Sequence, residues 1–203
     1  VFCPDARGAG ENREFAIEGK DDPRWATSSC KDFNNTAISL GQTLIGMQTW
    51  DLMRLVDYIE TLDYCDPSRI GCCGHSGGGW QTLWLTALDA RIRCAIVSGY
   101  FHGFRDTILK TNRCGCNFVP GLWEMIDVGD LAALIAPRPL LIESGAFDRL
   151  NGERGLVDVT EQLDITRRAY QVHQVEERLV QHIFDDVHRW DGAKMPEFLG
   201  RWL

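Results

Sequence analysis

Three residues of this chain have the types and the order along the chain that acyl transfer by a serine nucleophile requires. Ser76 is the centre of Gly74-His75-Ser76-Gly77-Gly78, a G-x-S-x-G pattern between a strand-like run and a helical one. The turn brings the departing helix close to the strand, so glycine is needed on both sides of the serine. This geometry exposes the hydroxyl above the carboxyl end of a parallel sheet, where it can attack a carbonyl carbon.

A serine nucleophile also needs a histidine base and an acid that orients it, and both follow in the order serine, acid, histidine. Asp148 lies in the loop after the apolar run 139–144, and His188 lies in the loop after the strand-like run 177–184. The sequence therefore predicts a triad of Ser76, Asp148 and His188. Taken singly, Asp148 could be a turn residue and His188 a surface histidine.

The elements that must position these residues alternate between strands and helices, without repeats or a linker. We expect strands at 69–73, 94–98, 139–144 and 177–184, and the tail of another at 1–3. A helix over 46–62 has an apolar face, and a final helix begins with Pro196 in its first turn. The apolar face is formed by Met47, Trp50, Met53, Val56, Ile59 and Leu62. The predicted fold is α/β, with a mostly parallel sheet and helices on both faces.

Composition restricts the partners of the chain. Its 203 residues carry a net charge of −8, which argues against nucleic acid or an anionic membrane surface as a partner. The sequence has no apolar run of the roughly 18–20 residues that span a bilayer and no signal-peptide pattern at its start, and the compartment stays open. Eight cysteines are present, and their even number does not prove disulfides. Cys72, Cys73 and Cys94 lie in strand-like runs, where a free thiol behaves as a small apolar group.

Two other segments could contribute to chemistry. Tyr100, Phe101 and His102 follow an expected strand at the catalytic end of the sheet, so they either line a substrate pocket or plug the core beneath the loop. Cys114 and Cys116 could form a metal site with His102, but the sequence has no second closely spaced ligand pair. A disulfide to a distant cysteine, or free thiols, fits this loop better. No metal and no other cofactor is expected.

The chain resembles the α/β-hydrolases, and within them the branch of dienelactone-hydrolase-like and acetyl xylan esterase-like carboxylesterases. The resemblance spans nearly the whole chain, although dienelactone hydrolases carry cysteine where this chain has Ser76. It rests on Asp5-x-Arg7-Gly8-x-Gly10-Glu11, Trp50-Asp51-x-x-Arg54-x-x-Asp57-Tyr58, Asp66-Pro67-x-Arg69-Ile70-Gly71, Gly74-His75-Ser76-Gly77-Gly78, Ala136-Pro137-Arg138-Pro139 with Gly145-x-x-Asp148, and His188-x-Trp190-x-Gly192.

The resemblance implies a serine carboxylesterase that acts on small-molecule or carbohydrate-linked esters, with Gly77 N–H as one donor of the oxyanion hole. It also implies that residues 1–203 form a single but partial catalytic domain, because the family's N-terminal strands are missing. The absent strands would favour self-association or an N-terminal segment supplied from elsewhere. Two alternatives remain: the catalytic domain of a prolyl-oligopeptidase-type serine peptidase, and a catalytically silent binding module.

Overall fold

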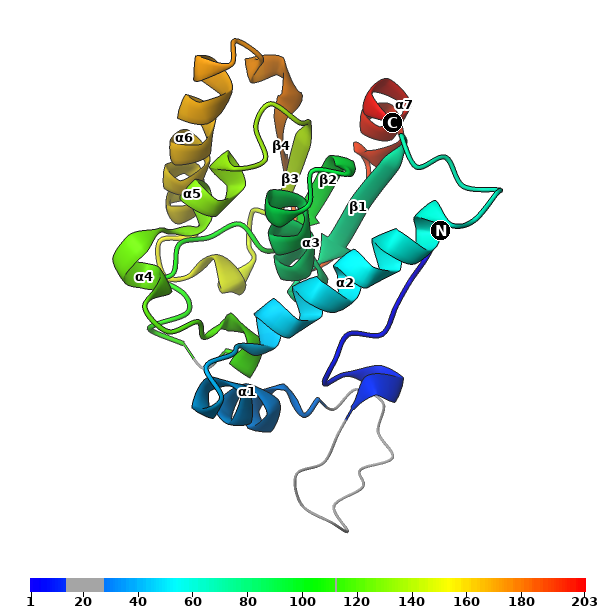
Figure 1. Cartoon of the computed structure of the whole chain (residues 1–203). Coiled ribbons are helices and arrows are strands. Elements are labelled where there is room, and N and C mark those ends of the chain that lie inside the picture. The colour runs from blue at the N-terminus through cyan, green and yellow to red at the C-terminus, as the bar shows by residue number, and fades with distance from the viewer. Residues whose placement is uncertain (14–27, 112) are drawn as a thin grey trace.

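A four-stranded parallel sheet forms the centre of the computed structural model, which describes residues 1–13, 28–111 and 113–203. The strands lie in the order in which they occur in the chain, and each is joined to the next through a helical segment (Figure 1). They are β1 (Ile70–His75), β2 (Ile92–Ser98), β3 (Leu140–Gly145) and β4 (Leu179–Phe184). The four internal strand predictions are confirmed.

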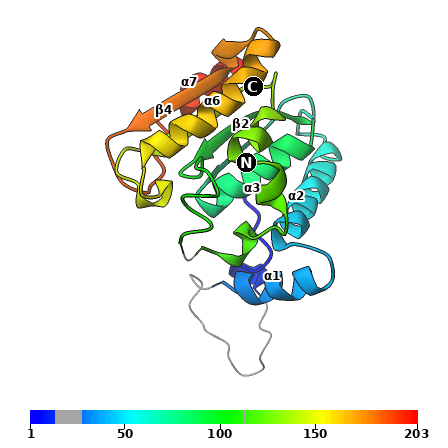
Figure 2. The ribbon, with the colours of Figure 1, turned by 90° about the vertical axis from the view of Figure 1, so that its left-hand side faces the viewer.

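Helices cover both faces of the sheet, as predicted, and Figure 2 shows α6 and α7 on either side of β4. They are α1 (Cys30–Ser39), α2 (Leu44–Glu60), α3 (Gly77–Leu88), α4 (Leu122–Met125), α5 (Val128–Ala133), α6 (Leu156–Val172) and α7 (Met195–Trp202). Four short 3-10 turns lie at Gly10–Asn12, Gly115–Asn117, Arg149–Asn151 and Glu176–Arg178. Pro196 lies in the first turn of α7, as predicted.

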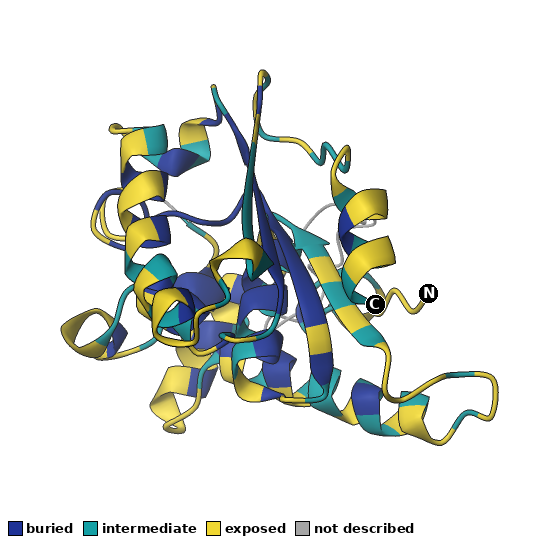
Figure 3. Cartoon of the chain, turned by 90° about the horizontal axis from the view of Figure 1, so that it is seen from above, coloured by how far each residue is buried: buried dark blue, intermediate teal, exposed yellow. Residues whose placement is uncertain are grey.

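The core is divided by the sheet. On one face, Val97 and Ile142 pack with residues of α3, α5 and α6, and on the other face Ile96 and Leu141 pack with Phe198 of α7. Neighbouring residues of a strand point to opposite faces, so β2 and β3 are apolar throughout most of their length. Figure 3 shows these buried strands between helices whose outer surfaces are exposed.

Three sequence predictions need correction at the edge of the sheet. Residues 1–3 are exposed and form no strand, and without a hydrogen-bonded neighbour an extended segment is not a strand. Cys73 is exposed, and among the described residues β1 pairs with β2 alone, so this strand lies at the edge of the described sheet. Trp50 is also exposed, and the guanidinium of Arg54 lies 4.3 Å from the centre of its ring.

The helix that carries Trp50 buries only part of the predicted face. Val56 is buried and Met53 packs in its cluster, whereas the first half of the helix buries residues outside that face. Its buried residues are Leu44, Ile45, Gln48, Thr49 and Val56. Gln48 donates to the backbone oxygen of Arg7 over 2.8 Å, and Arg7 makes a two-bond ion pair with Asp51. The helix thus turns a partly polar face toward the N-terminal segment. In the described parts of the chain, no helix has the length and apolar character needed to span a bilayer.

Candidate active site

Ser76 lies between β1 and α3 with a backbone that few non-glycine residues adopt. Its φ is 56° and its ψ is −121°. A Cβ on Gly74 would lie 2.2 Å from the carbonyl oxygen of Gly78, and a Cβ on Gly79 would lie 2.9 Å from that of Ser98. The approach at Gly74 explains the glycine before the serine, but on the other side the close approach is at Gly79 and not at Gly78, where a Cβ would meet no atom within 4 Å. The prediction that glycine is needed on both sides is therefore correct only for Gly74. The strained conformation of Ser76 is of the kind that clusters at functional sites.

The start of α3 offers a site for negative charge beside Ser76. The N–H of Gly77 is the first of the helix and has no acceptor within it. A Cβ on Gly77 or on Gly78 would meet no atom within 4 Å, so open space borders this end of the helix. Free N–H groups and the helix dipole make such an end favourable for an oxyanion.

Asp148 and His188 form the second part of the site. His188 Nδ1 lies 2.7 Å from Asp148 Oδ2, and Asp148 Oδ1 accepts a hydrogen bond from the backbone N–H of Leu150. The Asp148 side chain is buried, whereas that of His188 is 29% exposed. Because a carboxylate only accepts, Nδ1 carries the proton of the neutral imidazole and Nε2 is left as the basic nitrogen.

The nucleophile turn and His188 meet through His75. The ring centres of His75 and His188 are 4.4 Å apart, with the planes inclined by 36°. Gly99 closes this contact, since a Cβ there would lie 2.7 Å from His75 Cε1 and 3.0 Å from His188 Cε1. Ser76 and His188 both belong to the described residues, and the Ser76 hydroxyl makes no hydrogen bond to the His188 ring. The structure thus brings Ser76, Asp148 and His188 to one end of the sheet, with the His188 ring already oriented by the Asp148 carboxylate.

Asp186, a neighbouring aspartate of the histidine loop, is paired away from His188. Asp186 accepts from Arg189 Nε over 2.6 Å and from the backbone of Val187. The hydrogen bond from Arg189 lowers the pKa of Asp186. The ion pair keeps Asp186 engaged with its own loop.

Tyr100, Phe101 and His102 are buried with the core, so their exposure gives no support to the prediction that they line a pocket. The Tyr100 hydroxyl bonds to the Asn117 side chain, and the Tyr100 ring lies 4.9 Å from that of Trp80. Burial lowers the pKa of His102 to about 3, so this imidazole is neutral. Their burial agrees with the alternative to a pocket, a core plug beneath the loop.

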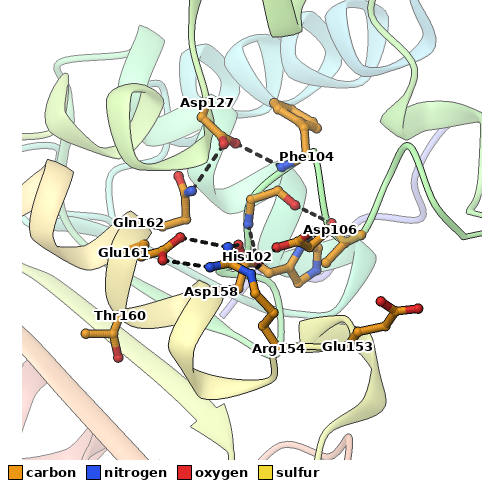
Figure 4. A network of polar contacts seen from close by, with 12 residues as sticks. His102, Phe104, Asp106, Asp127, Glu153, Arg154, Asp158, Thr160, Glu161 and Gln162 are labelled. Carbon is orange, nitrogen blue, oxygen red and sulfur yellow. Dashed lines mark hydrogen bonds and ion pairs between the residues drawn. The ribbon is translucent and has the colours of Figure 1, made fainter.

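Two carboxylates, the buried one of Asp158 and the half-buried one of Asp127, hold the loop that contains His102 (Figure 4). Asp158 Oδ2 accepts from the backbone N–H of Gly103 over 2.7 Å, and Asp127 Oδ1 accepts from that of Phe104 over 2.9 Å. Burial raises the pKa of Asp158 to about 6. The loop after β2 is therefore fixed by α5 and α6 rather than by the nucleophile turn.

The eight cysteines are all free thiols. The thiols of Cys30 and Cys116 lie beside that of Cys114 and lower its pKa. Among the residues that the structure describes, the group of side chains able to hold a metal ion is Glu143, His182 and Asp191, and it includes neither these thiols nor His102.

Sequence reasoning missed the contacts that surround His188. The sequence indicated no specific role for His75 and no partner for His182. In the structure, His182 Nε2 lies 2.8 Å from Asp191 Oδ2. A signal was present in the run Pro139-Leu-Leu-Ile-Glu-Ser144, because a glutamate inside an apolar strand must find a partner when it is buried. Glu143 is that residue, and it is fully buried.

Comparison with known proteins adds a family to this geometry. Residues 10–113 match the model of the prolyl oligopeptidase family. The candidate hydrolase YtaP of Bacillus subtilis is 29% identical over 169 residues, which cover 80% of this chain and 56% of YtaP. The chain thus spans about half the length of this relative.

Solved structures share the fold at lower identity. A glucuronoyl esterase from Caldicellulosiruptor kristjansonii superposes with a TM-score of 0.66 at 19% identity, covering 89% of this chain and 55% of the esterase. A candidate acetyl xylan esterase from Bacteroides fragilis gives a TM-score of 0.64 at 16% identity, with coverages of 78% and 40%. These similarities establish the α/β-hydrolase fold that the sequence predicted.

Proposed function

The chain belongs to the prolyl oligopeptidase family, and from this membership and the geometry of the site we propose that it is a serine hydrolase of carboxylic esters. The observation that carries the proposal is the pairing of a strained serine turn with an oriented imidazole. Ser76 has a φ of 56°, and His188 Nδ1 lies 2.7 Å from a buried carboxylate oxygen of Asp148. Neither arrangement is needed by a structural loop, and together they are the parts of an acyl-transfer site.

The reaction proceeds in two steps. His188 Nε2 accepts the proton of the Ser76 hydroxyl as Oγ attacks the ester carbonyl, and the protonated imidazole then gives that proton to the departing alcohol. Water attacks the acyl-enzyme with the same base and restores the serine. Asp148 stays ionised, fixes the tautomer of His188 and stabilises the transient imidazolium.

Gly77 N–H stabilises the oxyanion in both steps. It lies at the start of α3 beside open space, so the carbonyl oxygen can approach it without meeting a side chain. Removal of one such donor costs about 3–4 kcal/mol of transition-state stabilisation in serine hydrolases. A backbone N–H at this position can bond to the carbonyl oxygen of any ester that fits the site, so Gly77 itself does not select the substrate.

The substrate class in this proposal is a small or carbohydrate-linked ester. The fold neighbours named above include an enzyme described as a glucuronoyl esterase and a candidate acetyl xylan esterase. The family description favours a second candidate, a serine peptidase that cleaves after proline. Both reactions use the same three residues, so only substrates distinguish them.

Two chromogenic substrates test the choice. Purified protein is assayed with p-nitrophenyl acetate and with Gly-Pro-p-nitroanilide, beside Ser76→Ala and the exposed-serine control Ser39→Ala. We expect ester hydrolysis that Ser76→Ala removes and Ser39→Ala preserves. Faster Ser76-dependent release of the anilide would establish the peptidase instead, and absence of both activities in protein that also resists a fluorophosphonate would indicate a binding module.

A further inference from the structure

Four polar residues form a row across the sheet, one on each strand. In the pairing register His75 lies beside Ser98, Ser98 beside Glu143, and Glu143 beside His182. Paired residues of parallel strands point to the same face. The residues two positions earlier include Ile96, Leu141 and Val180, which pack against α7. The row therefore lies on the α7 face, closer to the carboxyl end of the sheet. We call these four residues the polar row.

The polar row contacts the segment that contains His188. The His75 ring lies against that of His188, and Ser98 Oγ lies 3.2 Å from His75 Nδ1. Further along the row, Glu143 Oε1 accepts from the backbone N–H of Gly192 over 3.0 Å. His182 Nε2 lies 2.8 Å from Asp191 Oδ2. Residues 188–192 are thus attached to three of the four strands.

Glu143 has a feature that stability does not explain. Its side chain is fully buried, and its Oε2 has no hydrogen-bond partner among the described residues. A buried carboxylate oxygen without a partner costs free energy, and an apolar side chain of similar size would avoid that cost. Such a residue is expected where a function is gained in exchange.

The same side chains could be considered for a metal ion, since ligand atoms of Glu143, His182 and Asp191 lie within 4.8 Å of one another. The contacts favour another role. Asp191 already bonds His182 through Oδ2 and pairs with Arg189 through Oδ1, which brings a cation to the cluster. Positioning of residues 188–192 uses every contact that the polar row makes with them.

We propose that the polar row is a set of positioning residues that holds residues 188–192 so that His188 keeps Nδ1 on Asp148 and presents Nε2 for catalysis. The proposal rests on the proposed function in that it assigns His188 as the base. It goes further by naming what orients the base besides the acid. Asp148 holds the Nδ1 atom of the His188 ring. The polar row holds residues 191 and 192, which follow His188 in the chain, and His75 of the row packs against one face of the His188 ring.

The charge of His75 suits this role. Burial lowers its pKa, and the nearby His188 lowers it further. His75 is therefore neutral at neutral pH, and the imidazolium that forms on His188 meets no positive charge across the 4.4 Å contact.

Two variants of Glu143 separate positioning from a structural role. Glu143→Gln keeps an oxygen acceptor for Gly192, whereas Glu143→Leu removes it, and Ser144→Ala is the matched control on the same strand. Two readouts are used: the downfield proton resonance of His188 Nδ1–H, which needs no turnover, and the rate of Ser76 modification by a fluorophosphonate. Thermal unfolding is measured for each variant.

We expect Glu143→Leu to keep or raise the melting temperature, to shift or broaden the His188 resonance, and to slow modification about 10- to 100-fold. Glu143→Gln should restore both readouts nearly to the wild-type values, and Ser144→Ala should leave them unchanged. Should Glu143→Leu fail to fold, Asp191→Asn in the loop tests the same attachment, with a smaller shift in the same direction.

Three results would overturn the proposal. These are an unchanged resonance and modification rate in a folded Glu143→Leu protein, equal losses in Glu143→Leu and Glu143→Gln, and stoichiometric Zn²⁺ binding that Glu143→Leu abolishes. If wild-type Ser76 resists the fluorophosphonate while the His188 resonance still depends on Glu143, the proposed function fails and the positioning role stands.

Discussion

Ser76 and the His188–Asp148 pair reach the same end of the sheet, but different features hold them there. Ser76 is fixed by its own backbone, with a φ of 56° between Gly74 and α3. Its strand, β1, pairs on one side only and exposes Gly71 and Cys73. The proposed nucleophile thus depends on a turn at an edge of the described sheet.

The acid–base pair depends on contacts between distant segments. The loop after β3 supplies Asp148, the loop after β4 supplies His188, and side chains of β3 and β4 bond to residues 191 and 192. One half of the site is therefore built around a single turn, residues 74–79, which is set against Ser98 of β2, and the other half from two loops that lie far apart in the chain. Perturbations should therefore act on the two halves in different ways.

The largest effect is expected where the two halves act together. Ser76→Ala and His188→Ala should each lower p-nitrophenyl acetate hydrolysis about 10⁴-fold or more, because attack and proton transfer occur in one step. The double variant should be scarcely slower than either single variant. Steady-state assays with His173→Ala as an exposed-histidine control measure this coupling, and additive losses would show that the residues do not act as a unit.

The acid–base half can be weakened without removing the base. Asp148→Asn should lower kcat about 10²- to 10⁴-fold, because an amide can no longer fix the productive tautomer of His188. The exposed Asp164→Asn is the matched control. Equal kcat in the two variants would contradict the role of Asp148.

The nucleophile half should fail through its backbone. A Cβ on Gly74 would lie 2.2 Å from the backbone oxygen of Gly78, whereas a Cβ on Gly78 would meet nothing within 4 Å. Gly74→Ala should therefore cost about 1–3 kcal/mol of unfolding free energy and disrupt the turn, and Gly78→Ala should leave stability nearly unchanged. Chemical denaturation compares the two, and similar stabilities would mean that the turn has room to relax.

How far the sequence could predict this site follows the same division. The Gly74–Gly78 turn consists of consecutive residues with a recognisable pattern, so its conformation could be predicted. The strands that lead to Asp148 and His188 could be predicted from their apolar runs. The cross-sheet register that places Glu143 beside His182 depends on how the strands pair, and no local pattern contains it. Trp50 was misplaced for a related reason, since the face that α2 buries is decided by its contacts with Arg7 and α3.

A second effect on stability, of similar size to that of Gly74→Ala, concerns the histidine beneath the site. Burial lowers the pKa of His102 to about 3 from an ordinary value near 6.5. As the pH falls, the unfolded chain therefore binds a proton on His102 before the folded protein does. Its contribution to stability is complete above pH 6.5 and is lost as the pH falls toward 3. Between pH 6 and 4, His102→Gln should lose less stability than the wild type, by about 1.4 kcal/mol per pH unit.

Asp158 has the opposite dependence, and the comparison has to allow for it. Burial raises its pKa to about 6, so it destabilises the fold as the pH rises from 4 to 6. Asp158 is present in both proteins, and its contribution cancels in the difference between their denaturation curves. Parallel curves for wild type and His102→Gln would mean that His102 titrates normally in the folded state.

The most direct test of the central claim is the site of covalent modification by a fluorophosphonate. Intact-mass and peptide analysis should find one phosphonate per chain, attached to Ser76, because the helix start beside it accommodates the charged oxygen and His188 accepts the proton. The rate should fall sharply in His188→Ala and less in Asp148→Asn. A folded wild-type protein that carries no label on Ser76, or that labels at an unchanged rate without His188, would contradict the account.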